Sequence, residues 1–381
     1  MKSNLPLVEK FFPCKNCGAS LRYSIKTGNL KCPYCGYENR IEEVDADLKE
    51  YSFKEALRVL EKTKFPPLKE HDAKCPSCGA VFKIEENIFS GKCPYCGTFV
   101  VEEVRDFRPI FAKSLIPFLI DRKKAFLIFK KWIKSLWFAP SKLKNSSFEL
   151  KFIGYYLPYW TFDSDTKTYY EGRRGDYYFE DETFFVNEGG RLIEKRGSVQ
   201  KIRWRFVSGW VFRRFDDVVV GASKRLPRKI IDSLSPWPFE KAVGYDEKYI
   251  SGFKGEIYQI GLKDGFEIAK LYMNQVIRED VRRDIGGDRQ EILHLSTIYE
   301  NKTFKHLLLP VWIADFRYEN KNYRFAINAA TGKIKGERPY SKWKIFFTVI
   351  TILVLVAALF YLGDKYGYLF EEARRASSPY Y

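Results

Sequence analysis

The hexapeptide "KCPYCG" occurs at residues 31–36 and again, letter for letter, at residues 92–97. In both copies an earlier Cys-x-x-Cys-Gly precedes it, with 14 residues between the two cysteine pairs. The second set of four cysteines follows the first at a constant distance of 61 positions. The repeat therefore predicts two copies of one structural unit.

The spacing is typical of a zinc ribbon with four cysteine ligands. A Cys-x-x-Cys turn presents two sulfurs to one tetrahedral ion, and the second turn supplies the other two. The glycine after each pair fits such a turn, because glycine adopts positive φ at no steric cost. We predict two structural Zn²⁺ ions. The ligands of the first are Cys14, Cys17, Cys32 and Cys35, and those of the second are Cys75, Cys78, Cys93 and Cys96.

A disulfide framework is the alternative use of eight cysteines. All eight fall into Cys-x-x-Cys pairs, and the chain after residue 96 has none. The first residues, "MKSNLPLVEKFF", lack an apolar stretch of secretory length, so we expect no export into an oxidising compartment. Zinc is favoured. Four thiolates close the coordination shell, so we expect a structural and not a catalytic metal.

The C-terminal stretch "IFFTVITILVLVAALFYLG" (345–363) contains 19 residues without a charge. At about 1.5 Å per residue it would cover roughly 28 Å, the thickness of a bilayer core. Five Lys or Arg residues lie shortly before it and three lie after it. Because positive charge favours the cytoplasmic side, we expect a single-pass protein of the inner (cytoplasmic) membrane with its N-terminal body in the cytoplasm.

The chain between these features predicts an α+β fold. The expected order is zinc ribbon 1 (1–46), a helical linker (47–70), zinc ribbon 2 (71–106), a basic amphipathic segment (107–144), an α+β body (145–341), a transmembrane helix (342–363) and a tail (364–381). Within the body, helices are expected at 227–234 and 264–287, the latter stopped by two glycines.

The body reads mainly as strands, and its clearest alternation is "QKIRWRF" (200–206). Ile202, Trp204 and Phe206 would face one side of the sheet, with Lys201, Arg203 and Arg205 on the other. The cations are either solvated or a phosphate-binding surface. "LPYWTFD" (157–163) and "LPVWIAD" (309–315) share Leu-Pro-x-Trp-x-x-Asp, which suggests an internal duplication of the sheet.

The segment 107–144 combines an apolar stripe at helical spacing with many lysines. Its stripe comprises Phe126, Phe129, Trp132, Ile133 and Leu136. Such a helix packs on its own domain, lies on an anionic membrane, or does both with different faces. Packing is the commoner outcome, and the sequence leaves both open.

The formal net charge of +17 indicates a polyanionic partner, either nucleic acid or the anionic inner leaflet. The chain has no Gly-x4-Gly-Lys-[Ser/Thr] phosphate loop, no Gly-x-Gly-x-x-Gly and no Gly-x-Ser-x-Gly. Its three histidines, His71, His294 and His306, form no His-Glu-x-x-His motif. We therefore expect no catalytic residues, no small-molecule substrate and no enzyme activity.

Several stretches together resemble a known family. They are the doubled ribbon, "KKWIKSLWFAPSKLK" (130–144), "YYLPYWTFDSDTKTYYEGRRGDYY" (155–178), "FDDVVVGAS" (215–223), "DIGGDRQ" (284–290) and "KHLLLPVWIADFRYENKNYRFAINAATGKIKGERPYSKWK" (305–344). The chain resembles bacterial membrane-anchored double zinc-ribbon proteins, also described as TFIIB-type zinc ribbon-containing proteins. They are often labelled "primosomal protein N-prime" or "replication restart helicase PriA". The resemblance runs from about residue 12 to the membrane span.

Members of this family tend to be encoded beside membrane scaffolds of the stomatin/flotillin type, which implies a membrane-organising role. The leading hypothesis is a non-enzymatic adaptor whose ribbons recruit a protein partner, such as a scaffold of that type. The alternative is a membrane-tethered nucleic-acid-binding protein related to DNA replication. Residues 75–104 argue against it, because they carry two lysines against four glutamates.

Overall fold

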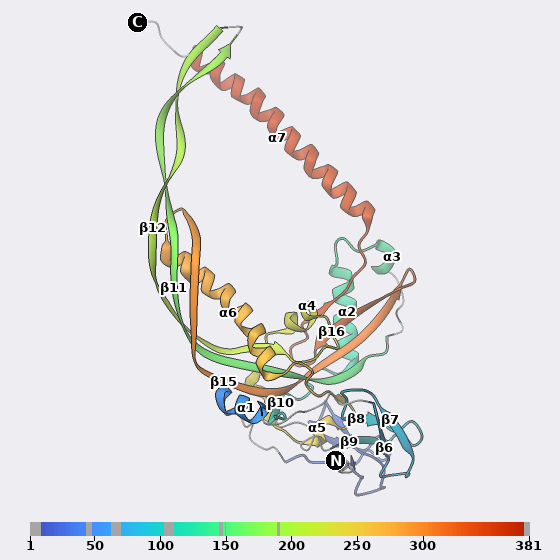
Figure 1. Ribbon diagram of the computed structural model, residues 1–381. Coiled ribbons are helices and arrows are strands. Elements are labelled where there is room, and N and C mark those ends of the chain that lie inside the picture. Colours follow the sequence, from blue (N-terminus) through green and yellow to red (C-terminus); the bar gives the residue numbers. More distant parts are fainter. Residues whose placement is uncertain are drawn as a thin grey trace.

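The computed structural model describes residues 9–42, 48–61, 70–102, 110–144, 148, 150–188 and 191–376 (Figure 1). These residues form a mixed helix and sheet fold with a sheet-rich body, as predicted. The helices are α1 (Phe53–Glu61), α2 (Arg122–Ser135), α3 (Ser141–Lys144), α4 (Arg228–Ile231), α5 (Glu247–Ile250), α6 (Leu262–Ile285) and α7 (Lys342–Ala376), with 3-10 turns η1 (Asp232–Leu234) and η2 (Phe239–Lys241).

The first nine strands belong to the ribbons and the linker. They are β1 (Glu9–Lys10), β2 (Arg22–Ser24), β3 (Asn29–Lys31), β4 (Glu38–Asn39), β5 (Tyr51–Ser52), β6 (His71–Lys74), β7 (Val81–Ile84), β8 (Ser90–Lys92) and β9 (Phe99–Glu102). The later strands are β10 (Ser114–Leu115), β11 (Ile153–Glu188), β12 (Arg191–Gly221), β13 (Val243–Gly244), β14 (Lys254–Gly255), β15 (Arg289–Tyr318), β16 (Lys321–Asn328) and β17 (Ile334–Gly336).

Two antiparallel ladders on β11 organise the body. On one side β11 pairs with β15, from Ile153 opposite Ile313 to Gly175 opposite Arg289. On the other side it pairs with β12, from Tyr159 opposite Gly221 to Glu188 opposite Arg191. The sheet order is β12-β11-β15-β10-β13, and β16 and β17 extend it beside β15.

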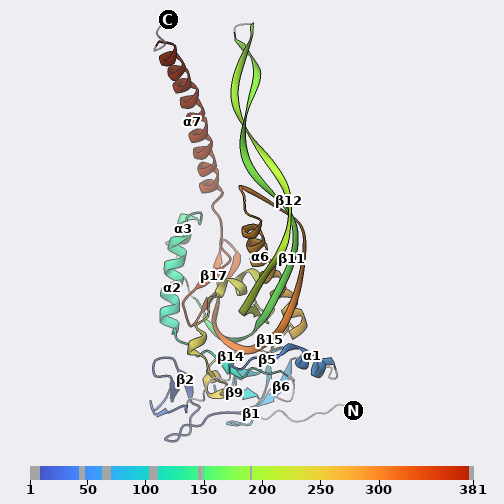
Figure 2. The same ribbon diagram turned by 90° about the vertical axis from the view of Figure 1, so that its left-hand side faces the viewer.

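β11 and β12 run on beyond the sheet as a two-stranded ribbon. The third strand, β15, begins opposite Gly175, so residues 176–188 of β11 have only β12 beside them. This β11–β12 ribbon projects from the body toward the side where α7 also extends (Figures 1 and 2). The sequence predicted strands here but not their length.

The helix α6 covers one face of the β11–β12 sheet. Its buried face includes Phe266, Met273 and Ile277, which share a core with Tyr170 and Phe215 of the sheet. The helix ends at Gly286, whose φ of 64° requires the left-handed region that glycine tolerates. The predicted helix and its glycine stop are confirmed, with the start two residues earlier than expected.

The predicted basic helix is α2, and its apolar stripe packs on the body. Asp121 caps it by accepting a hydrogen bond from the Lys124 backbone N–H. The Phe129 ring is fully buried and lies 4.6 Å from the Phe325 ring, in stacked geometry. Packing, the commoner of the two outcomes, thus holds for this stripe.

The repeated Leu-Pro-x-Trp motifs lie on neighbouring strands of one sheet, where Leu157 pairs directly with Leu309. A duplicated sheet is not shown by this arrangement. The two tryptophans anchor different cores: Trp160 packs under α6, and Trp312 packs beside α2.

The linker helix α1 also docks on the body, since Phe53 lies against Phe266 with ring centroids 4.8 Å apart.

One histidine of β15 lies deep in this body. The His306 ring lies against Trp160 in tilted geometry, with centroids 4.3 Å apart, and the Tyr258 ring meets it edge-on at 5.5 Å. Burial lowers the pKa of His306 to about 3, although the backbone of Phe111 and Ile110 opposes the shift. The imidazole is therefore neutral in the folded protein at physiological pH.

We predict that His306 makes the body less stable in acid. The pKa of His306 in the folded protein lies below its unfolded value near 6.5. Between these two values the imidazole is protonated in the unfolded chain and neutral in the folded chain. Stability is lost as pH falls below about 6.5, by about 1.4 kcal/mol at pH 5.5. His306→Phe should remove this loss of stability. The measurement is the apparent melting temperature of the variant minus that of the parent, which should be larger at pH 5.5 than at pH 7.5. His294→Phe, at an exposed site on the same strand, is the control. An equal difference at both pH values would contradict the prediction.

Candidate metal centres

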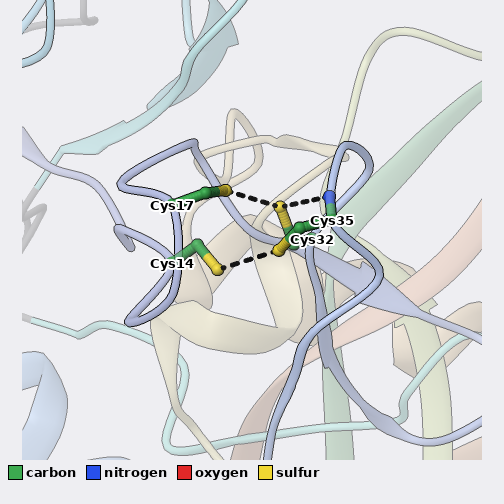
Figure 3. A group of neighbouring side chains, drawn as sticks. All are labelled: Cys14, Cys17, Cys32 and Cys35. Atoms are coloured by element: carbon green, nitrogen blue, oxygen red, sulfur yellow. Dashed lines mark hydrogen bonds between the residues drawn. The ribbon is translucent and has the colours of Figure 1, made fainter.

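The eight predicted ligands gather into two clusters, as the repeat requires. In the first, Cys14 Sγ lies 3.6 Å from Cys35 Sγ, and Cys17 Sγ lies 3.5 Å from Cys32 Sγ (Figure 3). All four sulfurs lie within 4.8 Å of one another. Each cluster thus draws one cysteine pair from each of its two turns.

The second cluster repeats this geometry. The sulfurs of Cys75 and Cys96 are 3.6 Å apart, and those of Cys78 and Cys93 are 3.8 Å apart. A tetrahedral ion with metal–sulfur bonds of about 2.3 Å separates its ligands by about 3.8 Å. Both clusters therefore fit one metal ion each.

The turns that carry the cysteines are built for this purpose. Gly18, Gly36, Gly79 and Gly97 all have φ between 73° and 77°, and each donates its backbone N–H to the carbonyl of the first cysteine of its pair. The Tyr37 backbone lowers the pKa of Cys35 to about 6, and Thr98 lowers the pKa of Cys96 to about 6. These donors favour the thiolate form, which binds metals, at Cys35 and Cys96. The backbone of Ala19 and that of Ala80 act to lower the pKa of Cys17 and that of Cys78, but the neighbouring cysteines outweigh them and raise both pKa values to about 12.

The first module is docked on the body by backbone contacts. The Tyr23 N–H donates to the Ser251 carbonyl at 2.9 Å, and the Ser251 hydroxyl donates to the Leu21 carbonyl at 2.8 Å. The Tyr23 ring also lies 5.3 Å from the Tyr249 ring. The apolar residues around Cys14 and Cys32 consequently belong to the same core as α2.

The second module docks a few residues further along the same segment. The Phe89 N–H donates to the Gly255 carbonyl at 3.0 Å, and the Gly255 N–H donates to the Ser90 hydroxyl at 2.6 Å. Gly255 is required here, because a Cβ would lie 2.2 Å from the Phe89 ring. Nearby, the buried Glu256 carboxylate accepts from Arg225 Nε at 2.9 Å. The modules are therefore part of the body and not free arms.

The two modules also contact each other. β1, which precedes the first module, pairs antiparallel with β9 of the second, with Lys10 opposite Val101. The Arg22 guanidinium lies 5.5 Å from the centre of the Phe99 ring. Together the modules form one end of the molecule, and α7 leaves the body on the other side (Figures 1 and 2).

Each module exposes an aromatic residue between the two cysteines of its second pair. Tyr34, between Cys32 and Cys35, is 79% exposed, and Tyr95, between Cys93 and Cys96, is 73% exposed. The repeated sequence "KCPYCG" contains both residues, but their exposure depends on the folded turn and does not follow from the cysteine spacing.

A third group of potential ligands is an ion-pair network. Glu50, Asp163 and Asp216 lie close enough to share an ion. However, Lys305 Nζ already lies 3.5 Å from Glu50 and 3.8 Å from Asp163, and it is 2.9 Å from Asp217. The protein's own ammonium group thus supplies the positive charge.

The cation row on β12 is largely neutralised within the ribbon. Lys201 pairs with Glu180 and Glu182 across the strands, and Arg205 pairs with Asp176 at 2.6 Å. The third cation, Arg203, lies 4.8 Å from the centre of the Tyr178 ring. The sequence alone could not show these cross-strand partners, because they depend on the register.

The predicted membrane segment is one continuous helix. Within α7, Lys342–Gly363 has a mean hydropathy of 2.8 and is long and apolar enough to cross a membrane. None of it is buried against the rest of the protein. The helix is consistent with a membrane anchor.

Metal analysis gives a direct test of the two centres. We expect two zinc ions per chain, and one in a Cys14→Ser/Cys17→Ser variant or in a Cys75→Ser/Cys78→Ser variant, measured by atomic emission after purification without added chelator. Tyr34→Phe, which leaves the thiolates in place, is the control and should retain both ions. Disulfide-linked cysteines in the metal-free, freshly isolated chain would contradict the prediction.

Comparison with known proteins adds one relative. The chain is 24% identical over 336 residues to the uncharacterized protein YdjG of Bacillus subtilis (strain 168), and the alignment covers 88% of this chain and 91% of that protein. No family model matches the chain. No solved structure matches it.

Proposed function

We propose that the chain is a non-enzymatic, membrane-anchored adaptor. In this proposal α7 holds the protein in the inner membrane with the body in the cytoplasm, and the two metal modules bind a protein partner. The observation that carries the proposal is the arrangement of the molecule, in which the modules and α7 lie on opposite sides of the body (Figures 1 and 2). A module so placed faces away from the membrane.

The charge next to α7 supports the orientation. Lys342 and Lys344 begin the helix, and Lys333, Lys335 and Arg338 lie just before it. Lys344 Nζ also donates to the Ala139 carbonyl at 2.8 Å, which fixes the start of the helix to the body. Cations at this boundary favour a cytoplasmic location and contact with anionic lipid headgroups.

Zinc is the metal that best suits the two clusters. Four thiolates in tetrahedral arrangement are the usual ligands of structural zinc, and they leave no position open for a substrate. The modules are small, so the metal would contribute on the order of 10 kcal/mol to their folding. The metal then holds the module surface in shape and takes no part in chemistry.

The exposed Tyr34 and Tyr95 give the modules a recognition surface. Tyrosine is enriched among residues that dominate protein–protein affinity, because it offers a large apolar area and one hydroxyl. Two equivalent tyrosines, held at a fixed separation, suit a partner with repeated sites, since the second contact becomes intramolecular. A scaffold of the stomatin/flotillin type, implied by the family resemblance, is such a partner.

We expect the substitution Tyr34→Ser/Tyr95→Ser to reduce capture of this scaffold at least tenfold. The measurement is chemical crosslinking of the intact chain in its native membrane, followed by immunodetection of the scaffold protein. Zinc content and membrane insertion should stay unchanged, because neither residue is a metal ligand or part of α7. Tyr340→Ser, which alters an exposed tyrosine next to α7, is the matched control and should capture normally.

Two results would contradict the adaptor. Equal capture of the scaffold by the parent and by the double variant would show that Tyr34 and Tyr95 do not contact it. Recovery of nucleic acid with the parent, lost at high salt, would favour the alternative of a membrane-tethered nucleic-acid-binding protein. The pairing of the β12 cations within the ribbon weighs against that alternative.

A further inference from the structure

A row of exposed aromatic side chains runs along β11 and β12, mostly where β15 still pairs with β11 and at the base of the β11–β12 ribbon. It lies on the face opposite α6. Val207 and Val211 of β12 pack under α6, and side chains at even-numbered positions of this strand point to the other face. We call this set the aromatic row. It consists of Phe179, Trp204, Phe206, Trp210 and Phe212, which are 70%, 40%, 81%, 48% and 68% exposed.

The aromatic row lacks the charges that usually interrupt an exposed strand. Every second residue of β12 from 198 to 212 belongs to this face, and these eight residues are Ser198, Gln200, Ile202, Trp204, Phe206, Ser208, Trp210 and Phe212. None of them is charged. The neighbouring strand β11 contributes Lys167, Glu171 and Arg173 to the same face, so the uncharged positions form a column along β12 with charges beside it. An exposed apolar column of this length indicates a surface that becomes covered.

The exposed area is large enough for a stable contact. The five aromatic side chains expose roughly 600 Å² if each carries about 200 Å² in full. This is at the upper end of apolar patches on monomeric proteins. Two such faces in contact would bury roughly 1,200 Å², the lower end of the range for stable interfaces.

The ribbon itself needs a partner. Beyond Gly175 it has only two strands, and α6 ends at Ile285, next to the start of β15. An isolated two-stranded hairpin is marginally stable in water, whereas further strands or a packed layer stabilise it. Of the aromatic row only Phe179 lies on this two-stranded part, because Trp204 pairs with Gly175 and the other three residues lie where β15 still pairs with β11. A second copy packed on the row would therefore cover the base of the ribbon.

Lipid is a poor occupant for this face. The row from 198 to 212 extends about 46 Å along the strand at 3.3 Å per residue. The ribbon and α7 leave the body on the same side, inclined to one another in Figure 1 and nearly parallel in Figure 2, so the row does not lie flat in the plane of a membrane that α7 spans. The open backbone edge of β12 could not enter hydrocarbon without losing hydrogen bonds.

We infer that the aromatic row binds the aromatic row of a second copy of this chain, face to face. Copies anchored by α7 in one membrane share one orientation, so their ribbons run in the same direction at the same height. Two cations of the neighbouring strand β11 lie over rings of the row: Lys167 Nζ is 5.0 Å from the Trp210 ring centre, and the Arg173 guanidinium is 5.5 Å from that of Trp204. The result is a two-fold interface with an apolar centre and a charged rim.

The test uses the intact chain in mild detergent, with its mass determined by light scattering after size exclusion. The parent should have twice the 44.8 kDa protein mass of one chain. Phe206→Arg alone, and Trp204→Ser/Phe206→Ser, should weaken self-association at least 100-fold and give one-chain particles. The control Leu127→Ser/Leu271→Ser changes exposed leucines of α2 and α6 and should remain dimeric.

Zinc content of each variant, two ions per chain, establishes that it is folded. A one-chain mass for the parent, or a dimer that survives Phe206→Arg, would overturn the inference. A one-chain parent whose tryptophan emission shifts to shorter wavelength on adding anionic vesicles, but not in the Trp204→Ser/Phe206→Ser variant, would assign the row to lipid instead. None of these outcomes depends on whether the metal modules bind a partner.

Discussion

The ladder between β11 and β15 is the constraint on which the rest of the structure depends. It joins residues 153–175 to residues 289–313, so more than a hundred residues of intervening chain close a loop around it. The intervening segment supplies two layers that stabilise the ladder. Helix α6 covers one face of the sheet, and the segment that contains α5 and β14 contacts the metal modules. A slip of one residue between β11 and β15 would turn the whole apolar set of the slipped strand toward the opposite face.

The parts of the molecule that were predictable from sequence are those with a local chemical signature. The eight cysteines carry their ligand spacing within a few residues, and α6 carries its apolar period and the Gly286 stop. The docking of the modules was not predictable, because Tyr23, Ser251 and Gly255 meet mainly through backbone groups. Periodicity likewise placed Trp204 and Phe206 on one face of a strand, but it contains no information on whether a second layer covers that face.

The metal modules share their apolar cores with the body, and this changes what their metal can do. Ala73, Cys75 and Cys93 belong to the same cluster as Leu157 and Leu309 of the central ladder. A structural ion in an isolated module stabilises only that module. Here an ion would also preserve a surface on which the sheet packs, so the modules form one wall of the body.

The contacts of the first module have a consequence for the order of events during synthesis. Its last ligand is Cys35, whereas its docking residue, Ser251, follows 216 residues later. At about 5–20 residues per second, translation needs roughly 10–40 s to cover that distance. During this interval no body exists to support the nascent module. The availability of free metal at the ribosome would then decide whether four reactive thiols are sequestered early or remain open to oxidation while the rest of the chain is made.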